Sequence, residues 1–233
     1  MTRFFSENIS ENTIELDAEE SRHLAKVLRY KEGEKVEVFD GKGNLYLCSI
    51  LKANPKKSLL NIEEAQHKKE KFFVTIAVAP PKNLSRWEWM SEKLTELGTD
   101  GIIPFISSNS ERKVLKLDRQ QKILISAAKQ SLKWKVPELS EPLGFKELLT
   151  MPFAGDKFIA HCYEGVQEKQ LLKNACRPRH ESLILIGPEG DFSESEVEQA
   201  LKNGFRAISL GSSRLRTETA ALAACHIINL ANE

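Results

Sequence analysis

The feature that most constrains the fold is a succession of five apolar runs that begins at Phe72. The runs are FFVTIAVA, GIIPFIS, KFIAHC, SLILI and RAISL, and helix-like segments separate them. Continuous apolar runs of this length are typical of parallel strands that are buried on both faces. Strands that alternate with helices favour an α/β fold. We therefore predict a parallel sheet, with its helices, over residues 71–233.

The segments between the runs carry helix signals. In SRWEWMSEKLTELG, apolar side chains recur every three or four residues and Gly98 ends the pattern. In SESEVEQALKNG, Ser193 and Glu196 have the spacing of a capping box. A last helix is expected from about Thr219, and AALAACHIINLA within it is apolar nearly all round. This pattern favours burial on several sides, either in a subunit interface or as the central helix of a monomer.

The first 70 residues follow a different pattern. VEVFD and NLYLCSI alternate apolar and polar positions, and Asp40–Asn44 between them supplies the turn of a hairpin. SLLNIEEA indicates a further strand, and one helix is expected from Asp17, with Glu20 as its capping partner, through ESRHLAKVLR. We predict a small β-barrel over residues 1–70, joined to the second domain by the charged residues Lys68–Lys71.

Composition excludes several classes of protein. The four cysteines stand far apart with no CxxC pair, so no metal site is expected, and reduced thiols fit a cytoplasmic protein. The segment MTRFFSENIS lacks the apolar core of a secretion signal, and no stretch approaches the ~18 apolar residues of a membrane span. A net charge of +1 leaves a nucleic-acid partner open, because the clustering of basic residues decides that question.

Two polar loops follow neighbouring strands of the predicted sheet. SLILI is followed by GPEGD (Gly187–Asp191) and RAISL by GSSRLRTET (Gly211–Thr219), while His161 and Cys162 end a third strand. Ligands bind beyond the carboxyl ends of parallel strands, so we expect a site here. There is no GxGxxG after the first strand and no P-loop pattern, which argues against NAD and ATP. The alternative is that the glycines are ordinary turn residues.

These loops also carry a family resemblance. GPEGDFSESE followed by SLGSSRLRTETA resembles the SPOUT superfamily of knotted RNA methyltransferases. Specifically, the chain resembles the RsmE family, which methylates N3 of a uridine in 16S ribosomal RNA of the small subunit. RHLAKVLRYKEGE, EKLTELGTDGIIP and SAAKQSLKWKVPEL match in the same order, so the resemblance covers essentially the whole chain.

The resemblance implies the rest of the architecture. It implies a PUA-like RNA-binding barrel, a deep trefoil knot near the C-terminus, S-adenosylmethionine (SAM) bound in the knot, and a homodimer packed through it. The implied partner is 16S rRNA within the small ribosomal subunit. One departure is Lys133, where the family often has arginine. Lysine lacks the planar fork of arginine, which puts a bidentate phosphate contact at this position in question.

Cofactor contacts are expected, by the same resemblance, from the two loops and one strand end. The residues are His161, Gly187, Pro188, Glu189, Gly190, Leu210, Gly211, Leu215 and Thr217. Leu210 and Leu215 would sandwich the adenine while backbone groups read its edge, as in a mostly apolar pocket with a few polar contacts. The alternative for these residues is plain core packing.

The proposed reaction sets further requirements. N3 of uridine is weakly acidic and a poor nucleophile until its proton leaves. The site should therefore supply a base, or a cation that stabilises negative charge on the uracil oxygens. We expect Arg216 to be the cation and Glu218, more weakly, the base. Alternatively, Arg216 and Glu218 pair with each other or with the partner subunit and hold the knot.

RNA contacts are expected mainly from the N-terminal helix. Arg22, Lys26 and Arg29 are four and three residues apart, which places them on one side of that helix. Such a line of cations suits phosphate contacts. The residues expected to bind RNA are Arg3, Arg22, His23, Lys26, Arg29 and Lys82. The alternative is a solvated helix face.

Three other functions remain open at this point. A related SPOUT methyltransferase would act on the ribose 2′-oxygen of RNA, and the whole-chain match argues against it. A ribosome-binding factor could keep the knot without activity, and SAM binding would separate it from an enzyme. A metabolic enzyme acting on a small anionic substrate is the most distant alternative.

Overall fold

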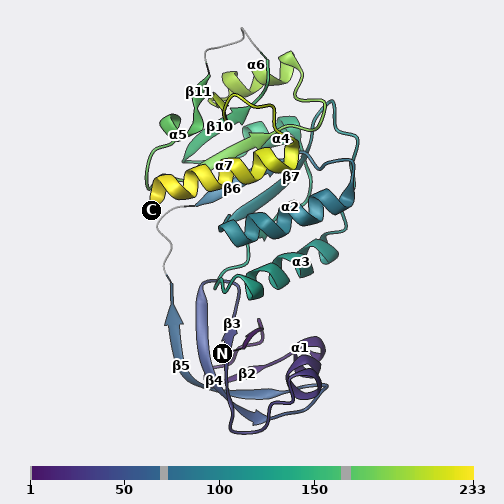
Figure 1. The fold of residues 1–233 in the computed structure, drawn as a ribbon, viewed down its shortest axis with the longest axis vertical. Coiled ribbons are helices and arrows are strands. Elements are labelled where there is room, and N and C mark those ends of the chain that lie inside the picture. The colour runs from purple at the N-terminus through teal and green to yellow at the C-terminus, as the bar shows by residue number, and fades with distance from the viewer. Residues whose placement is uncertain (1, 69–72, 164–168) are drawn as a thin grey trace. The chain divides into compact units, whose positions relative to one another are not determined.

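The computed structural model describes residues 2–68, 73–163 and 169–233 (Figure 1). The chain divides into two compact units. The first comprises Met1–Lys69 together with Ile125–Val136, and the second comprises Glu70–Leu124 together with Pro137–Glu233. Apart from Lys68, the charged joint predicted between the two domains lies outside the described residues.

The first unit is built on a five-stranded sheet of order β1-β3-β4-β5-β2. The strands are β1 Arg3–Phe5, β2 Thr13–Glu15, β3 Lys35–Phe39, β4 Asn44–Lys52 and β5 Leu59–His67. The predicted hairpin is confirmed, because β3 and β4 pair antiparallel. Its turn is closed by Asp40, whose carboxylate accepts from the backbone N–H groups of Lys42 and Asn44. The short strands β1 and β2 were not predicted.

The N-terminal helix begins as predicted but ends differently. The carboxylate of Asp17 caps α1 (Ala18–Arg22) by accepting from the N–H of Glu20 at 2.8 Å. The Glu20 side chain does not return to the cap, however; it pairs with Lys129. From His23 to Val27 the backbone widens into a π-helix, η1, so the predicted helix is confirmed but ends at Val27 and not at Arg29.

The second unit is an eight-stranded sheet with helices on both faces. Its order is β11-β13-β10-β12-β6-β7-β8, β9 also pairs with β7, and every pairing is parallel. The strands are β6 Val74–Val78, β7 Gly101–Ile106, β8 Glu138–Leu139, β9 Leu143–Gly144, β10 Asp156–Ala160, β11 Gln170–Leu171, β12 Ser182–Ile186 and β13 Arg206–Ser209. The five predicted strands are confirmed as β6, β7, β10, β12 and β13, and the two-residue edge strands were missed.

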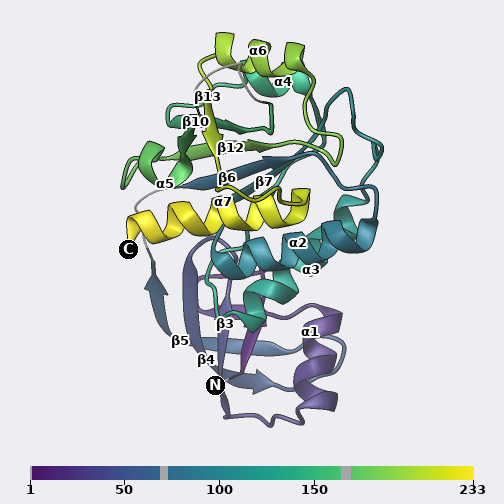
Figure 2. The same ribbon diagram turned by 45° about the horizontal axis from the view of Figure 1, so that its top comes forward.

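Helices come between and after the strands of this sheet along the chain. They are α2 Leu84–Leu97, α3 Leu117–Gln130, α4 Phe145–Thr150, α5 Leu172–Ala175, α6 Glu194–Lys202 and α7 Thr217–Asn232. Helix α7 packs against α2, α5, β6 and β12, whereas α4 and α6 lie across the other face (Figures 1 and 2). The capping box of α6 is confirmed, since Ser193 and Glu196 exchange hydrogen bonds. Helix α7 starts at Thr217, two residues before the predicted position.

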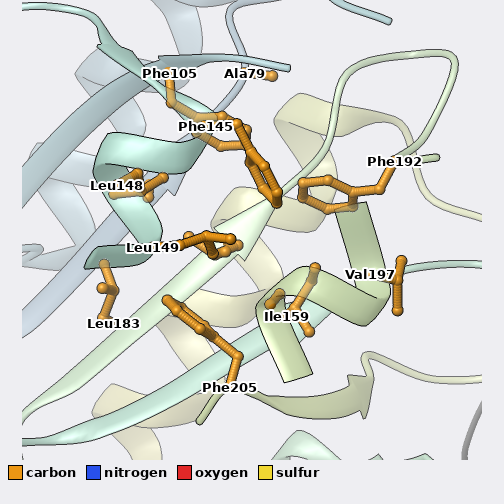
Figure 3. Packing of buried hydrophobic residues seen from close by; sticks show 13 residues of the cluster. Ala79, Phe105, Phe145, Leu148, Leu149, Ile159, Leu183, Phe192, Val197 and Phe205 are labelled. Carbon is orange, nitrogen blue, oxygen red and sulfur yellow. The ribbon is translucent and has the colours of Figure 1, made fainter. Parts of the chain in front are cut away.

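A hydrophobic core that combines phenylalanine rings with aliphatic side chains lies beneath α4 and α6 (Figure 3). Phe192 stacks on Phe105 with ring centroids 6.0 Å apart and contacts Phe145 at 5.8 Å. Phe192 follows the GPEGD loop directly, so the core anchors one end of that loop. A Cβ atom on Gly187 would lie 3.0 Å from the Phe192 ring, and glycine is therefore required by close approach at the other end.

Candidate functional site

A cavity of about 700 Å³ opens at the carboxyl ends of β10, β12 and β13, within the second unit. The ladder brings these ends together, because Ala160 of β10 is level with both Ile186 of β12 and Ile208 of β13. The lining residues are Ala160, His161, Cys162, Lys169, Ile186, Gly187, Pro188, Glu189, Asp191, Ile208, Ser209, Leu210, Gly211, Ser212, Ser213, Arg214, Leu215, Arg216, Thr217 and Ala220. The two loops singled out from the sequence thus form the walls of one cavity.

Most residues expected to contact a cofactor lie on this cavity. Those that line it are His161, Gly187, Pro188, Glu189, Leu210, Gly211, Leu215 and Thr217. Gly190 is not among the lining residues; its carbonyl oxygen accepts a hydrogen bond from Asn109 at 3.2 Å. Cys162, Asp191 and Arg214 also line the cavity; the sequence placed them at the expected site but assigned them no contact with a cofactor, and Lys169 was not singled out at all.

Hydrogen bonds fix the two loops against each other. The N–H of Asp191 donates to the carbonyl oxygen of Pro188 at 2.9 Å, which closes the GPEGD turn. The buried hydroxyl of Thr217, at the start of α7, donates to the carbonyl oxygen of Gly187 at 3.0 Å. In the second loop, Gly211 has a φ of +134°, a conformation that residues with a side chain rarely adopt. The cavity is therefore shaped largely by backbone groups.

His161 supplies the most distinctive polar group of the cavity. The residue is 7% exposed, and neither ring nitrogen has a hydrogen-bond partner among the residues that the structure describes. Burial lowers the pKa of this imidazole, and the nearby Lys169 ammonium lowers it further. Buried polar atoms are normally paired. The neutral ring is therefore suited to a polar atom of a bound ligand.

Arg216 and Glu218 lie in different surroundings. Arg216 is exposed, lines the cavity and immediately precedes α7. The Glu218 side chain is 8% exposed and is absent from the cavity lining; its carboxylate lies 3.7 Å from the guanidinium of Arg86 on α2. The ion pair between Arg216 and Glu218 that the sequence suggested as an alternative is not found among the described residues. Instead, Glu218 joins α7 to α2.

The cations expected to bind RNA fall into two groups. Arg22, Lys26 and Arg29 are exposed on the first unit and have no ion pair within the described segments. Arg3 and Lys82, in contrast, are already paired. His23 belongs to neither group. It is half-buried, and its ring centroid lies 5.8 Å from that of Phe4.

The two paired cations have different partners. Arg3 lies opposite Glu37 in the β1–β3 register and donates to its carboxylate at 2.7 and 3.1 Å, with 8% of its side chain exposed. Lys82 forms an exposed ion pair with Glu111 at 2.7 Å. Arg3 is therefore poorly placed to bind RNA, because Glu37 accepts from its Nε and Nη2 atoms and its unpaired Nη1 atom is buried.

Neither a metal centre nor a membrane-spanning helix is found among the described residues. No group of three or more His, Cys, Asp or Glu side chains could hold a metal ion in the described part of the chain. Over the same residues, no helix combines the length and the apolar composition needed to cross a bilayer.

Comparison with known proteins gives the family. Residues 68–229 match the model of an RNA methyltransferase domain, and residues 16–63 match that of an RNA methyltransferase PUA domain. Ribosomal RNA small subunit methyltransferase E of Bacillus subtilis is 31% identical, covering 100% of this chain and 98% of that protein. This chain belongs to the ribosomal RNA small subunit methyltransferase E family.

Solved structures of the methyltransferase E family and its relatives agree with the fold. A protein from Porphyromonas gingivalis described as a probable rRNA-methyltransferase is 37% identical with a TM-score of 0.93, covering 100% of this chain and 98% of that one. Methyltransferase E of Neisseria gonorrhoeae, solved with bound SAM, is 31% identical with a TM-score of 0.79, covering 97% of this chain and 95% of that one. The family resemblance stated from the sequence is confirmed.

Cys162 provides a test of what enters the cavity. It is the exposed one of the four cysteines, whereas Cys48, Cys176 and Cys225 are buried. Burial and the neighbouring Asp191 carboxylate raise the pKa of its thiol, so less thiolate is present at a given pH than for free cysteine. We expect one thiol to react with Ellman's reagent in the native protein, more slowly than free cysteine, and saturating SAM to suppress that reaction. The three buried thiols should react with the reagent only after the protein is denatured.

A cysteine variant shows whether the reacting thiol of the native protein is Cys162. Cys162→Ser should abolish the native reaction while denatured protein still yields three thiols. If SAM binds in a separate calorimetric titration yet leaves the reaction rate of Cys162 unchanged, SAM does not occupy this cavity.

Proposed function

We propose that this protein is a SAM-dependent methyltransferase that modifies N3 of a uridine in 16S ribosomal RNA. The observation that carries the proposal is the shared cavity formed by the GPEGD and GSSRLRTET loops at neighbouring strand ends. A family member from Neisseria gonorrhoeae was solved with SAM bound. The uridine N3 target rests on the resemblance to the RsmE family.

The cavity residues fit such a cofactor. Gly187 and Gly211 leave backbone groups open to a ligand, and Leu210 and Leu215 supply apolar side chains for the adenine ring. The ring nitrogens of His161, which bond to none of the described residues, can bind a polar atom of the cofactor. When bound, SAM supplies an electrophilic methyl group on a sulfonium. The protein's own residues then need only orient the acceptor and stabilise the charge that develops on it.

Arg216 is proposed to stabilise that charge. Loss of the N3 proton leaves negative charge on the uracil oxygens, and a guanidinium beside them favours the anion. Arg216 is placed for this role by its position at the cavity and by its exposure to an incoming nucleotide. Glu218 would have to leave Arg86 before it could act as the base. We therefore assign Arg216 the larger part in activating N3.

RNA binding is proposed for the exposed cations of the first unit. Arg22, Lys26 and Arg29 lie on α1, η1 and the turn that follows, free of acidic partners in the described residues. The match of residues 16–63 to a PUA domain of RNA methyltransferases supports this role. Phosphate contacts of this kind hold an RNA without reading its sequence.

The knot and the dimer remain part of the proposal. We expect the cavity loops to lie in a trefoil knot and α7 to form the interface of a homodimer. The support for the interface is the apolar surface of α7, on which Leu230 is 54% exposed and Ile227 is half-buried. We further propose that the protein acts in the cytoplasm on an assembled small ribosomal subunit.

The reaction is tested by label transfer. Purified small subunits and their protein-free 16S rRNA would be incubated with the enzyme and labelled SAM, and the nucleosides analysed. We expect label in N3-methyluridine, with more from the assembled subunit. Label on a ribose oxygen would place the enzyme in the other SPOUT class. Demonstrable SAM binding without transfer to any of a tested range of RNAs would indicate a binding factor.

Arg216→Ala tests the proposed cation. We expect kcat to fall by about 100- to 1,000-fold, as when a single stabilising donor is removed, while the Kd for SAM changes little. Lys202→Ala, an exposed change on α6 away from the cavity lining, is the control and should leave kcat unaltered. Full transfer by Arg216→Ala with normal SAM binding would exclude the catalytic assignment.

Charge reversal tests the RNA surface. Arg22→Glu with Arg29→Glu should weaken RNA binding and reduce its salt dependence, by about 0.7 to 0.9 in log–log slope for each phosphate that the protein no longer neutralises. SAM affinity should stay unchanged. Lys146→Glu with Lys173→Glu, exposed reversals on α4 and α5, controls for net charge. If the double variant loses RNA binding and SAM binding together, the variant is misfolded or Arg22 and Arg29 do not act on RNA alone.

A further inference from the structure

Asp191 has a backbone conformation that its side chain does not favour. It lies on the cavity with a φ of +61°, in the left-handed region that residues with a Cβ atom adopt at a cost. Aspartate tolerates this region better than most residues, but glycine would be free of strain. The local backbone alone therefore gives no reason for an aspartate here.

The carboxylate of Asp191 makes a bond that glycine could not make. Its Oδ2 atom accepts from the backbone N–H of Cys162 at 2.8 Å, and its Oδ1 atom accepts from the N–H of Phe192 at 2.8 Å. The last residues of β10 and β12 that pair are Ala160 and Ile186. The Asp191–Cys162 bond thus joins the two chain segments beyond the point where the sheet ladder ends.

The rest of Asp191 is held just as firmly. Its N–H donates to Pro188, and the Nδ2 amide of Asn109 donates to the carbonyl oxygens of Gly190 and Asp191 at 3.2 and 3.0 Å. Phe192, the next residue, is packed in the aromatic cluster. The loop is therefore fixed from the β7 side and from the core, and the carboxylate connects this fixed loop to the segment that carries His161.

We propose that Asp191 is a positioning residue that sets the distance between two walls of the cofactor cavity. The carboxylate holds the backbone after His161 against the GPEGD loop before any ligand arrives, so the cavity is pre-organised and less ordering is needed on binding. This inference rests on the proposed function, since it takes SAM as the ligand. It assigns Asp191 no direct contact with the cofactor's charge.

Three variants separate the bond from the backbone conformation. Asp191→Gly removes the carboxylate and relieves the left-handed strain. Asp191→Asn replaces one of the two accepting oxygens with an NH2 donor, so one of the two N–H groups loses its acceptor. Glu194→Gln, an exposed change in the first turn of α6, removes a nearby carboxylate that makes no bond between strand ends.

Four readouts are measured on each purified full-length variant. They are the melting temperature, the Kd for SAM, the Kd for S-adenosylhomocysteine, and hydrogen–deuterium exchange of the ligand-free protein over the peptides that contain Cys162 and Phe192. For Asp191→Gly we expect an undiminished melting temperature, about tenfold weaker binding of both ligands, and faster exchange at the Cys162 amide. Asp191→Asn should give intermediate values, and Glu194→Gln should match the wild type.

The outcomes distinguish the inference from the proposed function. Unchanged ligand affinity in Asp191→Gly would overturn the positioning role. Weaker binding of SAM alone would also overturn it, because that result means a direct contact with the sulfonium charge. If the wild type binds neither ligand, the proposed function fails, whereas the exchange of the ligand-free variants still reports whether the carboxylate holds the Cys162 segment.

Discussion

The parallel pairing of β10 with β12 on one side and β13 on the other determines where this protein places its chemistry. Ala160 is level with Ile186 and with Ile208 in the two pairs. The residues that come next, His161, Gly187 and Ser209, therefore lie at the same edge of the sheet. Loops that are far apart in sequence thereby become opposite walls of one cavity. Two further contacts hold those walls: the Thr217 hydroxyl on the Gly187 carbonyl, and the Asp191 carboxylate on the Cys162 amide. The aromatic core beneath α4 and α6 anchors one wall through Phe192.

Much of this architecture could be predicted from the sequence because the determining signals are local. A strand buried on both faces must be a continuous apolar run, and all five such runs became central strands of the sheet. Parallel strands in turn bring their carboxyl ends to one edge, which located the cavity from the sequence pattern alone. The identity of the ligand did not follow from these patterns. It came from the resemblance of the two loop motifs to a family, which the whole-chain match to methyltransferase E supports.

The features that could not be predicted depend on partners distant in sequence. The Glu20 carboxylate binds Lys129 instead of its own helix cap, and the helix beyond it widens into a π-helix. Arg3 resembles a free cation in the sequence, yet a cross-strand carboxylate binds it. Glu218 was a candidate base from its place beside Arg216, and the helical turn points it instead at Arg86. The left-handed backbone of Asp191 likewise carries no sequence signal of its own, since aspartate is common in ordinary turns.

The proposed function requires SAM to bind in the cavity at the ends of β10, β12 and β13, and a crystal structure of the protein grown with SAM would show whether it does. We expect density for the cofactor between the Gly187–Gly190 and Leu210–Leu215 segments, with the adenine between Leu210 and Leu215 and a polar ligand atom within hydrogen-bonding distance of His161. Density for SAM elsewhere on the chain, or an empty cavity at a SAM concentration that saturates binding in solution, would contradict it.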